Sequence, residues 1–128
     1  MGQPTKEDAH LLVQLARLTA ELKLSEATGF LWSENFVSDY EEFKQKFPFG
    51  SDEARYVGSI AGFYETVATL VKHDLISAEL IHDWLGSNLV WSRLESILLG
   101  QRDESGEPRL WENFEALAAA RTGAGVSA

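Results

Sequence analysis

One segment, from Ser51 to Val71, constrains the fold of this chain more than any other. Its apolar residues recur every three or four positions, and they are Val57, Ile60, Ala61, Tyr64, Val67, Ala68 and Val71. This spacing places them on one side of an α-helix, and Phe63 and Leu70 widen the apolar side further. A helix with so broad an apolar side lies at the centre of a domain. The sequence therefore predicts a central helix around which other helices pack.

Apolar residues keep the helical spacing on both sides of this segment. Two helices are expected before it, one capped by Thr5 and one stopped by Pro48. Their apolar stripes are Leu11, Leu15, Leu18 and Leu22 in the first, and Phe36, Tyr40, Phe43 and Phe47 in the second. Three shorter helices are expected after it, from Ser77 to a left-handed Gly86, from about Asn88 to Gly100, and from Pro108 to Gly123. The polar stretch "QRDESGEP" before the last helix predicts a loop.

The chain is therefore expected to be all-α, a single-domain helical bundle of about six helices with a central third helix. No segment alternates apolar and polar residues as a strand does. Residues 5–121 should form the domain, with a loose N-terminus at residues 1–4 and a flexible tail at residues 122–128. A chain of 128 residues is long enough to build one core without disulfides.

Two glycines in the central helix, Gly58 and Gly62, lie one turn apart. Each glycine inside a helix costs about 1 kcal/mol relative to alanine. This cost predicts a compensation, in which another helix crosses the central helix there at short distance. The alternative is that the two glycines are merely tolerated.

Composition excludes several classes of function. The formal net charge is −9, from 11 basic and 20 acidic residues, and the chain has no basic run. Nucleic acids and anionic membranes are bound through lysine and arginine, so neither is an expected partner. There is no cysteine, and the chain carries no glycine-rich phosphate loop or nucleophilic Gly-x-Ser-x-Gly motif. No apolar stretch approaches the roughly 20 residues that span a bilayer. We expect a cytoplasmic protein without a cofactor.

Two Glu-x-x-His pairs raise the question of a metal site. They are Glu7 with His10 and Glu79 with His82, the spacing that helical di-metal carboxylate proteins use. Glu7, however, lies in the first turn of its helix, where a carboxylate faces solvent and the positive end of the helix dipole. Glu79 and His82 fall opposite the apolar side of their helix, which consists of Leu80, Ile81, Trp84 and Leu85. We therefore expect no metal, and a di-metal protein is only a remote alternative.

Three residues are candidates for binding a small molecule. Glu65 lies midway along the central helix beside Tyr64, and a buried glutamate there would be a candidate functional group. With Trp91, these residues could line a pocket between the central helix and the tryptophan-bearing helices. The alternative is that Glu65 has no functional role and lies at the solvent-exposed edge of its helix. An enzyme or a small-molecule-binding protein is thus the second hypothesis, and no catalytic residue is predicted.

Arg102 is a fourth candidate, with a structural interpretation beside the functional one. Arginine and tryptophan are enriched at protein interfaces, but they also build cores. Arg102 stands next to an acidic loop and could hold the start of the last helix through Glu112 or Glu115. This structural role is preferred to a role in ligand binding.

The first hypothesis is a non-enzymatic protein–protein interaction or regulatory module, with a homodimer as one form. Five apolar residues of the first part of the chain lie off the main stripes, and they are Leu12, Val13, Leu24, Leu31 and Trp32. Together they could form a second apolar surface, which is typical of a partner site.

A set of motifs after Arg55 resembles a known bacterial family. They are Leu75-Ile76, Leu85-Gly86, Trp91, Arg102 and the run from Phe114 to Ala118. Over residues 55–121 the chain resembles the DUF4760 family. The resemblance implies a helical domain. It supplies no catalytic residue.

Overall fold

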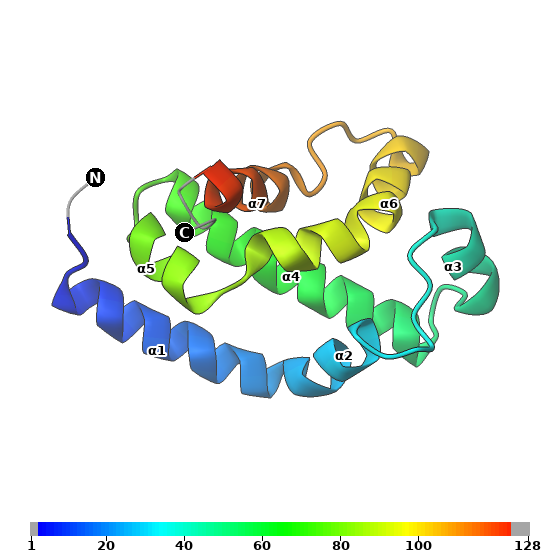
Figure 1. Cartoon of the computed structure of the whole chain (residues 1–128), viewed down its shortest axis with the longest axis horizontal. Coiled ribbons are helices and arrows are strands. Elements are labelled where there is room, and N and C mark those ends of the chain that lie inside the picture. Colours follow the sequence, from blue (N-terminus) through cyan, green and yellow to red (C-terminus); the bar gives the residue numbers. More distant parts are fainter. Residues whose placement is uncertain (1–2, 124–128) are drawn as a thin grey trace.

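A computed structural model describes residues 3–123, and these residues form seven helices and no strand (Figure 1). The helices are α1 (Lys6–Glu21), α2 (Leu24–Leu31), α3 (Tyr40–Lys46), α4 (Asp52–Lys72), α5 (Ala78–Trp84), α6 (Ser87–Ser105) and α7 (Glu112–Gly123). The predicted all-α fold is confirmed. The predicted tail at 122–128 falls mostly outside the described residues, and its first two residues belong to α7.

The predicted central helix is α4, which runs through the middle of the molecule (Figure 1). Its start is set by Ser51, whose hydroxyl accepts a hydrogen bond from the Ala54 N–H at 3.2 Å. Its fully buried residues include Val57, Ile60 and Val67, all from the predicted apolar side. Helix α2 packs on one side of α4, and α7, which also contacts α6, packs on another.

The helix that the sequence pattern missed is α2. Lys23 has a left-handed φ of 56° and turns the chain only two residues after α1 ends. The eight residues that follow place Leu24, Ala27 and Leu31 in the core. The sequence pattern assigns two of these residues, Leu24 and Leu31, to a second apolar surface. That assignment is wrong, because the turn at Lys23 directs both side chains inward.

The prediction of a close helix crossing at Gly58 and Gly62 is also wrong. A Cβ atom added at either position would meet no other atom within 4 Å. The neighbours of α4 pack against its apolar residues, and Gly58 is exposed to solvent instead. The close approach occurs at Gly100 of α6, where a Cβ atom would overlap the Tyr40 ring of α3.

Helix α6 and the segment after it differ from the prediction. The helix continues through Gly100 to Ser105 and ends at Gly106, which has the left-handed φ of 71°. Gly86 has a φ of −84° and precedes α6, so it is not the left-handed end of α5. The polar stretch is therefore helical in its first half.

Helix α7 begins at Glu112, four residues later than the prediction from Pro108. Trp111 blocks an earlier start, because its φ of 65° is incompatible with a helix. Its indole N–H donates to the Gln101 side chain of α6 at 2.9 Å, which holds this turn against α6.

Candidate functional site

The sequence candidates Tyr64, Glu65 and Trp91 do come together, and they meet around Phe114 at the start of α7. Phe114 is fully buried. The Tyr64 ring stacks on it with centroids 4.9 Å apart, and the Trp91 ring meets it edge to face at 5.1 Å. The Glu65 carboxylate accepts a hydrogen bond from the Phe114 backbone N–H at 2.9 Å.

This geometry gives Glu65 a structural task. The first N–H groups of a helix have no partner inside that helix, and a carboxylate beside them also complements the helix dipole. Glu65, which is half-buried, therefore caps α7 from the neighbouring helix α4. A second polar contact, from the Asn113 amide to the Thr69 hydroxyl at 3.2 Å, joins the same two helices. Phe114 occupies the space between Tyr64 and Trp91. Ligand binding by Tyr64, Glu65 and Trp91 stays a prediction.

The fourth candidate, Arg102, holds the start of α7 as its structural interpretation predicted. Its Nε donates to the Leu110 carbonyl at 2.9 Å, and its Nη2 donates to the Glu115 carboxylate at 2.9 Å. The partner is Glu115, whereas Glu112 pairs with Arg109 at 2.8 Å. Arg102 thus satisfies a loop carbonyl and a charge at once from two separate nitrogens of its guanidinium, a geometry that a lysine does not reproduce.

The four metal candidates are not brought to one place. Glu7, His10 and Glu79 are exposed, and only His82 is half-buried. Among residues 3–123 no group of three or more histidine, aspartate or glutamate side chains is arranged to hold a metal ion. The acidic residue of α1 with long-range contacts is Asp8, which sequence reasoning did not single out. Its carboxylate accepts from the Thr5 N–H at 2.8 Å and from the Ser77 N–H at 3.1 Å, and so ties α1 to the start of α5.

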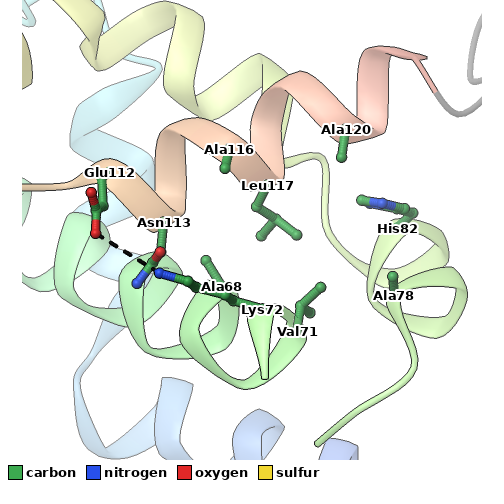
Figure 2. A pocket seen from close by; sticks show the side chains of 10 residues that line it. All are labelled: Ala68, Val71, Lys72, Ala78, His82, Glu112, Asn113, Ala116, Leu117 and Ala120. Atoms are coloured by element: carbon green, nitrogen blue, oxygen red, sulfur yellow. Dashed lines mark ion pairs between the residues drawn. The ribbon is translucent and has the colours of Figure 1, made fainter. Parts of the chain in front are cut away.

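His82 does not lie on a solvated face as predicted. Its ring points into a cleft between α4, α5 and α7 (Figure 2). The Nδ1 atom is buried and has no hydrogen-bond partner among residues 3–123. Burial lowers the pKa of His82 below its usual value, and the nearby charge of Arg121 lowers it further. The imidazole is therefore neutral at neutral pH.

The cleft beside His82 has a volume of about 410 Å³. It is lined by Ala68, Val71, Lys72, Ala78, His82, Glu112, Asn113, Ala116, Leu117 and Ala120. Most of its wall is apolar, and the charged groups Lys72 and Glu112 lie together at the end opposite His82 (Figure 2). Sequence reasoning missed it because its walls come from three helices that are separate in the chain.

A larger groove, of about 540 Å³, lies between α3, the start of α4 and the end of α6. Its apolar lining residues are Phe43, Phe47, Pro48, Phe49, Ala54 and Leu110. Phe49, in the turn between α3 and α4, has a relative exposure of 103%, so none of the residues that the structure describes covers its ring. Lys44 and Glu104 form an ion pair of 2.9 Å at the edge of the groove.

A family match covers nearly the whole chain. Residues 4–121 match the family described as "Domain of unknown function (DUF4760)". The chain belongs to the DUF4760 family. The resemblance seen from Arg55 onward is thus confirmed, and the match extends it to the N-terminal helices. No curated protein and no solved structure is similar enough to match.

The motifs that carried the resemblance have structural roles in this DUF4760 domain. Ile76 is buried at the turn between α4 and α5, and Trp91 and Phe114 pack together in the core. Arg102 joins α6 to α7. These residues therefore build the fold. Ala116 and Leu117 of the last motif also line the cleft beside His82, whereas the groove beside Phe49 lies outside the motifs. In the described part of the chain, no helix has the length and apolarity to cross a bilayer.

Proposed function

We propose that this DUF4760 domain is a non-enzymatic interaction module that associates through the face bearing Phe49, in the first place with a second copy of itself. The observation that carries the proposal is the uncovered Phe49 ring beside an aromatic groove. Full burial of a phenylalanine side chain contributes about 1.5–3 kcal/mol. A partner that covers Phe49 stabilises the complex by this free energy, because the ring stays in water in the isolated domain.

A second copy suits this face because the face carries both a protrusion and a hollow. In a twofold dimer the same patch of each subunit meets its counterpart, so the patch must complement itself. Phe49 of one copy can enter the groove beside Phe49 of the other, and the reverse contact forms at the same time. The lining rings of Phe43 and Phe47 offer the edge-to-face contacts that aromatic side chains prefer.

The edge of the groove has the polar character of an interface rim. Lys44 pairs with Glu104, and the Tyr40 hydroxyl donates a hydrogen bond to the same glutamate. An apolar centre with a polar, partly solvated rim is the usual anatomy of a specific protein–protein contact.

Light scattering after size-exclusion chromatography tests the proposal with Phe49→Ser and a matched control, Leu75→Ser. Leu75 is also an exposed large apolar residue, but it lies after the far end of α4, about 30 Å away by the rise of a 21-residue helix. We expect a concentration-dependent dimer for the wild type and for Leu75→Ser, and a monomer for Phe49→Ser. A wild type that stays monomeric at millimolar concentration, or equal loss of dimer in both variants, would overturn the proposal.

A further inference from the structure

The cleft between α4, α5 and α7 exists because its walls are made of small side chains. Four of its ten lining residues are alanines, and they are Ala68, Ala78, Ala116 and Ala120. Alanine side chains end at Cβ and leave the space between the three helices unfilled (Figure 2). A hollow of about 410 Å³ is in the range of sites for small molecules.

Hydrogen bonds fix the walls of the cleft on two sides. At one end, Arg121 of α7 donates from Nε to the His82 carbonyl at 3.1 Å and from Nη1 to the Asn88 side chain at 2.6 Å. At the other end, the Asn113 amide donates to Thr69 of α4. The cleft is therefore preformed, and a ligand would not have to order its walls, which lowers the cost of binding.

The charges at the Lys72 end favour an anion. Glu112 already pairs with Arg109 at 2.8 Å, whereas the Lys72 ammonium lies 4.0 Å from the same carboxylate. Because Arg109 holds Glu112 more closely than Lys72 does, the Lys72 ammonium is the cation of the cleft that is left loosely paired and can bind an anion. Among residues 3–123, Glu112 is the only carboxylate that lines the cleft.

The remainder of the cleft favours an apolar body. Ala68 and Leu117 are buried and form the floor of the cleft, and Val71 adds an apolar side chain to its wall. His82, neutral at neutral pH, closes the far end and presents no charge there. A ligand that fits this arrangement has an anionic head at Lys72 and an apolar part that extends toward His82.

From this arrangement we propose that the cleft binds a small monocarboxylic acid with an apolar chain or ring, its carboxylate at Lys72 and its apolar part over Ala68 and Leu117. The inference is independent of association through Phe49, because Phe49 precedes the first turn of α4 and Lys72 lies in its last turn.

The test is an NMR titration of the ¹⁵N-labelled chain with three probes of equal length: octanoate, 1-octanol and octylammonium, each below its aggregation concentration. We expect saturable amide shifts at His82, Ala116 and Ala120, with octanoate binding tightest and octylammonium weakest. Lys72→Gln should weaken octanoate about tenfold, the effect of one charge-assisted contact, and leave octanol unchanged. Octanol binding as tightly as octanoate, or shifts scattered over the surface, would overturn the assignment.

A pair of alanine variants separates the cleft from nonspecific adsorption. Ala116→Leu fills the cleft, while Ala119→Leu adds the same side chain at an exposed position of α7 that does not line it. Alanine and leucine have similar helix propensities, so both variants should fold. Octanoate shifts should vanish in Ala116→Leu and persist in Ala119→Leu. Persistence in both variants contradicts the proposal. Repeating the titration on Phe49→Ser should give the wild-type result, whatever the oligomeric state.

Discussion

Replacement of Glu65 tests whether this carboxylate is a structural cap or a functional group. In the structure it accepts the Phe114 N–H at 2.9 Å, at the start of a helix that contributes Phe114, Leu117 and Ala118 to the core. Loss of a helix cap costs about 0.5–2 kcal/mol. The charge at the positive end of the α7 dipole adds about 0.3–1 kcal/mol. Together these effects predict that Glu65→Ala lowers the free energy of unfolding by about 2 kcal/mol.

Urea unfolding followed by far-ultraviolet circular dichroism measures this loss, provided that the dependence on urea keeps its slope. Glu65→Gln is the matched control, because its amide oxygen still accepts the hydrogen bond but carries no charge. We expect the glutamine variant to lose less than half as much stability as the alanine variant. A functional glutamate held in place at a cost would behave differently, because its removal leaves stability unchanged or raises it. An unfolding free energy for Glu65→Ala within about 0.5 kcal/mol of the wild type, the usual range of surface substitutions, would refute the cap.

Three further predictions follow from single contacts. Gly100→Ala should destabilise the protein by about 1–3 kcal/mol, because the new methyl group would overlap the Tyr40 ring. Gly58→Ala, at an open helix position, should stabilise the protein by about 0.5–1 kcal/mol. Thermal melting of the two variants compares these effects. Arg102→Lys should lower the free energy of unfolding by about 1–2 kcal/mol, because a lysine lacks the separate Nε and Nη2 donors that reach the Leu110 carbonyl and Glu115. A melting temperature equal to that of the wild type contradicts this. His82 should make the protein less stable as pH falls below about 6.5, because its lowered pKa in the folded state means that the unfolded chain binds a proton more readily. The difference in urea midpoint between wild type and His82→Gln should therefore change between pH 7.5 and pH 5. A difference that stays constant refutes this prediction.

Local patterns in the sequence predicted the parts of the fold that depend on local physics. The apolar spacing from Val57 to Val71 placed α4 correctly, and Ser51, where the segment was expected to begin, is its N-cap. Helix α2 was not predicted because its N-cap residue, Lys23, makes no side-chain cap, and because the helix is only eight residues long. The start of α7 was misplaced since Pro108 suits a first helical turn, whereas the contact of Trp111 with α6 decides where the helix begins.

The candidate site was predictable only in part, for a similar reason. Tyr64, Glu65 and Trp91 were expected to lie together, and they do, but Phe114 is 49 residues from Glu65 and no local signal announced that it would fill the space between them. The full exposure of Phe49 is also a property of the assembled fold, because it depends on how α3 and α6 meet around the groove.

The absence of cysteine allows a direct measurement of the proposed self-association. A spin label is attached to a single cysteine introduced at Gln45, which is exposed on α3 and does not line the groove. The labelled chain is mixed with ¹⁵N-labelled wild type, and broadening is read on the wild-type amides. We predict broadening of the amide signals of Phe47, Phe49 and Leu110. This broadening should disappear when Phe49 of both chains is replaced by serine. Broadening centred on Trp32 and Leu89, or none at all, would contradict association through the Phe49 face.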